Sequence, residues 1–379
     1  MVLRRTCSIL ASIFLLASCS KEAGVVLHVD LGALRNEESS FFDYFDKVEI
    51  IPLDDAYQLS NGQYSEPQYL AVTDSFIFVL DEKSMRLVSF DADGKFIREV
   101  ARRGNAGNEY TLAYGIQADE EGQVRLLDPR GSIYTYNSAG RFVGRERIEG
   151  MLAVHKFIEG DWGTLLFTSS AENPLCVWRD GEAQPLRYSP AFDLKKQFNA
   201  AFPFVTIDGE VCYYEGLTGK IYTIDFEKGK TSVKYSWDFG RWNADLTKTT
   251  GAQYDFLKSL QNEFYDSVFP FLNILSVDGI LIADVLFQGR EHTIIVEPAS
   301  GAACCIDTFS EGIRLKVSTE REGVLYQIVE PESLPEFINP KVLDQENRMK
   351  YEAVIAGSQS NPVLLKYHGF SSRFFHRIR

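Results

Sequence analysis

LAVTDSFIFVLDEKSMRLVSFDADGKFIREV, residues 70–100, is the stretch that decides the fold. It contains four runs rich in β-branched and aromatic residues, separated by three short polar turns. The runs cover residues 70–72, 76–80, 86–90 and 95–100. Runs of this composition between Asp, Ser and Gly are typical of strands, and turns this short join antiparallel neighbours. The stretch therefore predicts one twisted, four-stranded antiparallel sheet.

The same pattern recurs along the chain. Residues 116–143 form a second copy, and the glycine of its last hairpin, Gly140, lies 46 residues after Gly94. Further hairpin glycines follow at intervals of 41, 48 and 72 residues: Gly181, Gly229 and Gly301. The last interval equals one repeat plus an insertion of about 25 residues, and a period in the forties with four strands per copy is typical of a β-propeller blade.

The repeats add up to a closed ring. Five blades are predicted to start near residues 66, 112, 151, 199 and 268. Three strand-like runs remain at the two ends of the chain: 48–53, 324–329 and 363–367. An open propeller would leave unpaired sheet edges, which promote aggregation, so we expect these runs to form a sixth blade built from both termini. The prediction is an all-β, six-bladed propeller over residues 47–379.

Two segments have helical periodicity instead. In residues 249–269, Phe256, Leu260 and Phe264 fall on one helical face, which predicts a helical insertion over about 245–268. A second, short C-terminal helix is predicted over about 340–356, with Asn339-Pro340 at its start and Gly357 at its end. Both helices are expected to pack on the rim of the propeller. The alternative is a lid over a binding site, which the aromatic cluster Trp237, Trp242 and Tyr254 would favour.

The N-terminus has the layout of an export signal. Arg4 and Arg5 precede an apolar run at residues 9–17, which is too short to span a bilayer, and Leu16-Ala17-Ser18 leads into Cys19. This ending resembles the lipobox of bacterial lipoproteins, in which the cysteine is acylated. We predict a lipoprotein signal peptide at 1–18, lipidation at Cys19 and a lipid-tethered linker at 19–46. The alternative is an ordinary signal peptide with an incidental cysteine.

Charge limits the choice of partners. The formal net charge is -14, and it becomes -16 when Arg4 and Arg5 are removed with the signal peptide. Such a field repels nucleic acid and other phosphate-rich surfaces, so no nucleic acid partner is expected. The charged residues are scattered along the chain, as on a well-solvated surface.

Cysteine and histidine give no pattern for a metal site or cofactor. Beyond Cys19, four cysteines lack paired C-x-x-C spacing: Cys176, Cys212, Cys304 and Cys305. Adjacent Cys304 and Cys305 would point to opposite faces of a strand, and buried thiols are expected, with one disulfide as the alternative. The five histidines are isolated in sequence: His28, His155, His292, His368 and His376. Asp91-Ala92-Asp93-Gly94 fits a hairpin turn better than a calcium loop.

The chain resembles the six-bladed β-propeller lipoproteins of Bacteroidota, a family with NHL-like blades and largely undefined function. The matching segments are Glu49–Leu53, Phe90–Ile97, Arg103–Tyr110 and Asn361–Leu364. The family loop is usually Gly-x-Gly-Pro-Gly-Glu-Tyr, and here Ala106 and Asn108 replace two glycines while Gly107 stands in place of the proline. The resemblance implies the propeller fold and carries over no catalytic residues.

These observations predict a binding or scaffolding module anchored in the cell envelope, at the periplasmic or surface side of the outer membrane. The ligand is expected to be carbohydrate or a partner protein. The candidate binding residues lie in the loop after the first blade and in the helical insertion: Arg102, Arg103, Glu109, Tyr110, Trp242 and Tyr254. In the competing interpretation, the loop only turns the chain and Trp242 belongs to the core.

An enzyme is the alternative function. A glycan lyase or glycoside hydrolase would use carboxylates at the mouth of the propeller channel, although a fold by itself never establishes such chemistry. Two carboxylates about 5–10 Å apart would favour hydrolysis. A flat aromatic patch would favour binding.

Overall fold

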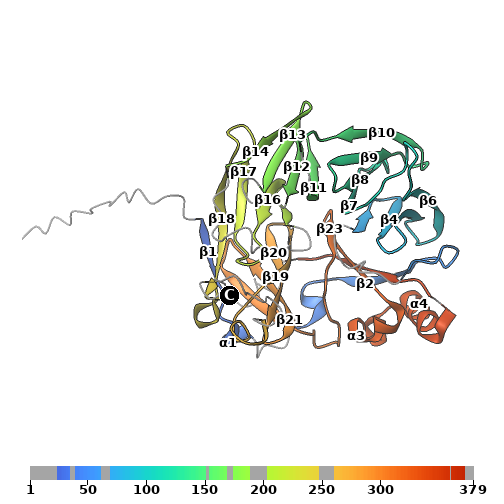
Figure 1. Ribbon diagram of the computed structural model, residues 1–379. Coiled ribbons are helices and arrows are strands. Elements are labelled where there is room, and N and C mark those ends of the chain that lie inside the picture. The colour runs from blue at the N-terminus through green and yellow to red at the C-terminus, as the bar shows by residue number, and fades with distance from the viewer. Residues whose placement is uncertain are drawn as a thin grey trace, which may run out of the picture.

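The computed structural model describes residues 24–34, 39–60, 69–150, 153–168, 174–187, 203–246, 260–358 and 360–371. Six sheets form a ring, which confirms the six-bladed β-propeller (Figure 1). Blade one contains β3 (Leu70–Val72), β4 (Phe76–Asp81), β5 (Arg86–Asp91) and β6 (Phe96–Arg102). Blade two contains β7 (Gly115–Ala118), β8 (Val124–Asp128), β9 (Ser132–Tyr136) and β10 (Phe142–Arg147). Blade three contains β11 (Val154–Gly160), β12 (Gly163–Thr168), β13 (Leu175–Arg179) and β14 (Glu182–Pro185).

The second half of the ring follows the same plan. Blade four contains β15 (Phe204–Ile207), β16 (Glu210–Tyr214), β17 (Ile221–Asp225) and β18 (Lys230–Asp238). Blade five contains β19 (Phe271–Val277), β20 (Ile280–Phe287), β21 (Arg290–Glu297) and β22 (Ala302–Ile306). Blade six contains β23 (Thr319–Arg321), β24 (Val324–Val329), β25 (Val363–His368) and β2 (Lys47–Pro52). First strands contact one another from β15 through β19, β23, β3 and β7 to β11, and residues of all six line one cavity, so these strands surround the central channel.

Blade six closes the ring with strands from both ends of the chain, as predicted. β2 pairs antiparallel with β25, from Lys47 opposite His368 to Pro52 opposite Val363. The outer edge of β2 is covered by α4 (Gln345–Ala353). There the Ile50 N–H donates to Oδ1 of the buried Asn347 at 2.8 Å. The helix therefore satisfies a donor on an edge strand that would otherwise be open to pairing with other chains.

Hairpin turns form where the sequence predicts them. The Asp91 carboxylate accepts hydrogen bonds from the N–H groups of Asp93 and Lys95, and Gly94 has a φ of +85°. A Cβ on Gly94 would lie 2.4 Å from the Pro52 carbonyl oxygen, so this turn needs glycine for both its backbone conformation and its contact with β2. The Asp91–Gly94 segment is therefore a turn, as predicted.

Buried apolar side chains gather between neighbouring blades. Leu80 of blade one and Leu126 of blade two, for example, belong to one buried cluster. The adjacent cysteines point in opposite directions, as expected: Cys304 is buried between blades five and six, and Cys305 between blades four and five. All four described cysteines are buried thiols.

The segment predicted as a linker, 19–46, needs a correction. From Val25 onward it packs on the propeller: β1 (Val25–His28) pairs in parallel with β18 as a fifth strand of blade four. Short helices follow at α1 (Leu31–Leu34) and η1 (Phe41–Asp43). Side chains of this segment are buried in the core: Leu27, Val29, Leu31, Phe41, Tyr44 and Phe45. Burial of these apolar groups holds the segment in place. The predicted signal peptide and Cys19 lie outside the described residues.

The helical predictions hold in part. The predicted helix at 340–356 is divided into η7 (Pro340–Val342) and α4, because Asp344 is a new N-cap whose carboxylate accepts from Asn347 N. The helix continues through η8 (Val354–Ser358), where Gly357 turns to a φ of +78°. Additional short helices are η4 (Gly240–Trp242), η6 (Pro331–Ser333) and α3 (Leu334–Phe337). Most of the predicted helical insertion, residues 247–259, lies outside the described residues. Within the described ranges, no helix is both long enough and apolar enough to cross a membrane.

Candidate functional site

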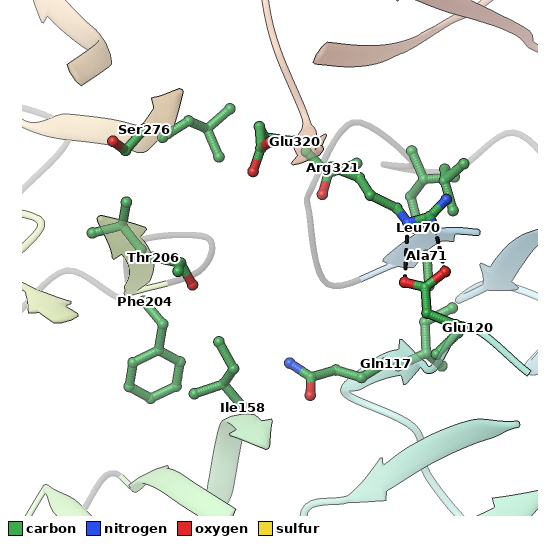
Figure 2. A pocket seen from close by; sticks show the side chains of 16 residues that line it. Leu70, Ala71, Gln117, Glu120, Ile158, Phe204, Thr206, Ser276, Glu320 and Arg321 are labelled. Carbon is green, nitrogen blue, oxygen red and sulfur yellow. Dashed lines mark hydrogen bonds and ion pairs between the residues drawn. The ribbon is translucent and has the colours of Figure 1, made fainter. Parts of the chain in front are cut away.

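The six inner strands enclose a cavity of about 350 Å³ at one mouth of the central channel. Every blade contributes to its wall. The labelled residues in Figure 2 are Leu70, Ala71, Gln117, Glu120, Ile158, Phe204, Thr206, Ser276, Glu320 and Arg321. These residues lie on the six inner strands, except for Glu120, which lies in the first hairpin turn of blade two. A pocket on the ring axis is a common ligand position, because many elements converge there.

Arg321 ties three blades together at this mouth. Its guanidinium binds the Asp74 carboxylate at 2.8 Å and also pairs with the Glu120 carboxylate (Figure 2 shows the Glu120 contact). The Arg321 side chain is only 14% exposed, whereas those of Asp74 and Glu120 are 80% and 63% exposed. Arg321 is therefore a structural clamp whose charge is already balanced.

Glu320, next to Arg321 on β23, is the second carboxyl group that lines the cavity. Burial raises the pKa of Glu320 above its usual value, although a hydrogen bond from the Gly323 N–H at 2.8 Å acts in the opposite direction. The neighbouring charges of Asp278 and Glu322 also raise this pKa. These neighbouring carboxylates disfavour the ionised form of Glu320, and the same negative charges would stabilise a cation bound beside it.

The rim of the mouth is acidic for a local reason. Three of the first hairpins have two-residue turns in which both residues have positive φ: Asp208-Gly209, Asp278-Gly279 and Glu322-Gly323. This geometry is that of a type I′ turn, which favours Asp or Asn followed by Gly. The turn requirement thus places carboxylates around the channel mouth, next to Asp74 and Glu120.

Two polar side chains in the wall differ in their hydrogen bonding. Gln117 donates to the Phe157 carbonyl at 3.2 Å and accepts from Glu159 N at 3.1 Å, so it bridges blades two and three. The buried Ser276 Oγ has no hydrogen-bond partner within the described part of the chain. A buried hydroxyl without a partner is costly to the stability of the fold.

The predicted loop residues lie at the opposite end of the ring. In the connection from β6 to β7, Glu109 accepts from Ala106 N at 3.0 Å and from Arg102 Nε at 3.4 Å. The Ala106 hydrogen bond is the main reason that the pKa of Glu109 is lowered. Arg103 forms a backbone bridge to Tyr110, which is fully buried and donates its hydroxyl to the Met85 carbonyl. These contacts close the turn.

Trp242 is not brought near that loop. It lies in η4, in the connection from blade four to blade five, three blades away around a ring of six. Its ring contacts Phe287 edge-on at 5.2 Å between centroids, and the Arg241 guanidinium lies 4.3 Å above it. Tyr254 is outside the described residues. The two predicted parts of the site share an end of the propeller but not a common surface.

Comparisons with known proteins support the fold. A crystal structure of a Bacteroides fragilis protein described as exported matches with a TM-score of 0.71 and 12% identity, over 92% of this chain and 100% of that one. A member of the DUF4221 family from Bacteroides vulgatus matches with a TM-score of 0.54 and 9% identity, over 86% and 97% of the two chains. No curated protein matches the sequence.

The family is shown by a sequence model rather than by these distant structures. The model described as domain of unknown function DUF4934 matches residues 26–368, which include all six described blades and β1 except for its first residue. The chain therefore belongs to the DUF4934 family.

Proposed function

We propose that this protein is an exported, lipid-anchored binding module of the cell envelope that holds a positively charged group of its ligand at the channel mouth. The acidic mouth is the observation that carries this proposal. Glu320 lines the cavity and the turn carboxylates lie in first hairpins at the same end of the ring, while Arg321, the cation lining the cavity, is balanced by Asp74 and Glu120. A mouth lined by one sign of charge concentrates ligands of the opposite sign.

Both ligand classes expected from the sequence can present such a group. An amino sugar offers an ammonium group with hydroxyls, and a partner protein offers a Lys or Arg side chain. The apolar part of the wall, at Ala71 and Ile158, would suit the body of either ligand. Phosphate-bearing ligands are disfavoured by the same carboxylates.

Ligand charge provides the first test. In titration calorimetry on the domain from residue 24 onward, a chitosan hexamer should bind about tenfold or more tightly than its neutral N-acetylated counterpart, as expected for about one favourable charge contact. Glu320→Gln should remove about tenfold of the affinity for the cationic oligomer. An oligolysine peptide tests the protein alternative. Arg102→Ala is the matched control, because it removes a charge at the other end of the ring.

The outcomes are distinct. Equal affinity for the charged and neutral hexamers, with no response to oligolysine, would exclude the cation site. A loss in Arg102→Ala equal to that in Glu320→Gln would move the site to the opposite face. Because the pKa of Glu320 is raised, oligolysine binding should weaken as the pH falls toward that pKa and the carboxylate becomes protonated.

Export and anchoring rest on residues 1–19 and on the likeness to a protein described as exported. Cys19→Ala should leave the fold intact and move the protein from the membrane fraction to the soluble fraction, because acyl chains stabilise membrane attachment by about 0.8 kcal/mol per buried methylene. Fractionation after a high-salt wash measures this. A variant that still sediments with membranes would contradict the lipoprotein assignment.

A glycan-active enzyme is the second candidate, and the raised pKa of Glu320 is the observation that favours it. A carboxyl group with a raised pKa is better suited to donate a proton as a general acid. The second catalytic carboxylate at the mouth would be Glu120, which is already paired with the Arg321 guanidinium. Release of reducing ends from a glycan, lost in Glu320→Gln, would establish catalysis. The binding proposal expects no turnover.

A further inference from the structure

His292, Cys305 and Asp307 form a three-residue cluster on one face of blade five. In the register of β21 and β22, Thr293 lies opposite Ile306 and Ile294 opposite Cys305, so His292 is opposite Asp307. Residues two apart share a face of a strand, so Cys305 lies beside Asp307 on the face turned toward blade four. One ligand atom from each residue lies within 4.8 Å of the other two.

The orientation of His292 prepares its Nδ1 atom for this cluster. The ring is buried, and Nε2 lies 3.3 Å from the Phe287 carbonyl oxygen, a partner that can only accept. Donation from Nε2 to Phe287 leaves Nδ1 with its lone pair directed at the Asp307 carboxylate. Two acceptors then face each other, and either a second proton or a metal ion must lie between them. A carbonyl partner on the second ring nitrogen is the usual arrangement of a metal-binding histidine.

We infer that His292, Cys305 and Asp307 bind a single zinc-type divalent metal ion. Imidazole nitrogen, thiolate sulfur and carboxylate oxygen are the three donors that Zn²⁺ uses in proteins, and the thiolate and imidazole disfavour Mg²⁺ and Ca²⁺. The Asp307 side chain is 54% exposed while that of His292 is 1% exposed. The ion would therefore enter from the Asp307 side, where water can supply a fourth ligand.

The proton balance is simple. The Cys305 thiol loses its proton to solvent as the sulfur–metal bond forms, and no electron is transferred. The metal replaces any proton held between His292 and Asp307.

The site lies next to the predicted aromatic residue Trp242, because Phe287 contacts both the Trp242 ring, at 5.2 Å, and the His292 ring, at 5.8 Å.

Cobalt substitution tests the inference on the intact domain. Co²⁺ added to the metal-free protein should bind with a stoichiometry of one and produce the near-ultraviolet charge-transfer band of a cobalt–thiolate bond. Zn²⁺ should displace it. Cys305→Ala should abolish the band, and the neighbouring Cys304→Ala is the matched control that should keep it, because Cys304 faces blade six.

A second variant keeps the test decisive if Cys305→Ala does not fold. Asp307→Asn alters an exposed side chain, so the fold should be unaffected. It should weaken Zn²⁺ binding by about 100-fold while keeping the cobalt–thiolate band, since even outer partners of metal ligands are worth 10–100-fold. No cobalt binding, or a band unchanged in Cys305→Ala, would show that His292 and Asp307 are only an ion pair.

Discussion

Deletion of residues 19–54 should abolish cooperative folding of the whole propeller rather than fray one end. The deletion removes β2, whose Ile50 is fully buried between blades five and six, and the aromatic residues Phe41 and Phe45, which pack against Tyr367. Each large apolar side chain contributes about 1.5–3 kcal/mol when buried. Several of them together reach the whole stability of a typical domain, about 5–15 kcal/mol. Urea unfolding followed by circular dichroism measures the loss.

A shorter deletion, of residues 19–34, is the control. It removes β1 and α1 but leaves η1 and β2, so the ring stays closed and a cooperative transition with a lower midpoint is expected. Asn347→Leu should give an intermediate effect of about 1–3 kcal/mol, because it leaves the buried Ile50 N–H without its acceptor. If the 19–54 deletion melts within a degree or two of the parent, closure by β2 does not hold the ring together.

The fold was predictable because its information is local and repeated. Each Asp-Gly or Ser-Gly turn marks a hairpin, and the surplus strands at the two ends of the chain can pair only with each other. The parallel addition of β1 to β18 has no such local signal, since four residues starting at Val25 dock on an edge that exists only in the assembled ring. The C-terminal helix is divided into η7 and α4 because Asp344 caps the start of α4, within a segment whose sequence pattern predicts one continuous helix.

The candidate sites were harder to predict for a related reason. Rare residues such as Trp242 and the Arg102-Arg103 pair attract attention in a sequence, yet the channel mouth is built from ordinary residues of six strands spread over some 250 positions. The Asp-Gly and Glu-Gly turns were the available signal, because a shared turn type places their carboxylates at one end of the ring. His292 and Cys305 lie 13 residues apart, and strand register alone brings them together.

Asp284→Asn should stabilise the protein by about 2–4 kcal/mol at pH 8 and leave its stability nearly unchanged at pH 4. Asp284 lies on β20 between Asn273 and Thr293 in register, and its carboxyl group accepts from the Thr293 hydroxyl at 2.7 Å. Burial raises the pKa of Asp284 from 3.8 to about 7, against the lowering effects of this hydrogen bond and of Lys316 and Arg314, while Glu291 raises it further. Ionisation is therefore more costly in the folded protein than in the unfolded chain.

The direction of the pH dependence follows from proton counting. Below about pH 4 the carboxyl group is protonated in both states, and Asp284 imposes no penalty. Between about pH 4 and 7 the folded state binds one proton more than the unfolded state, so stability falls by up to about 1.4 kcal/mol per pH unit. Above pH 7 both states are ionised and the full penalty of about 4 kcal/mol remains, as an upper bound from the pKa difference.

Asparagine keeps an oxygen for the Thr293 hydroxyl and cannot ionise, so its advantage over aspartate should grow across this interval. Urea unfolding at pH 4, 6 and 8 measures it, with the turn variant Asp278→Asn as control, expected within about 0.5 kcal/mol of the parent. An Asp284→Asn effect of the same size at pH 4 and pH 8 would show that packing, and not the buried charge, sets the energy of this site.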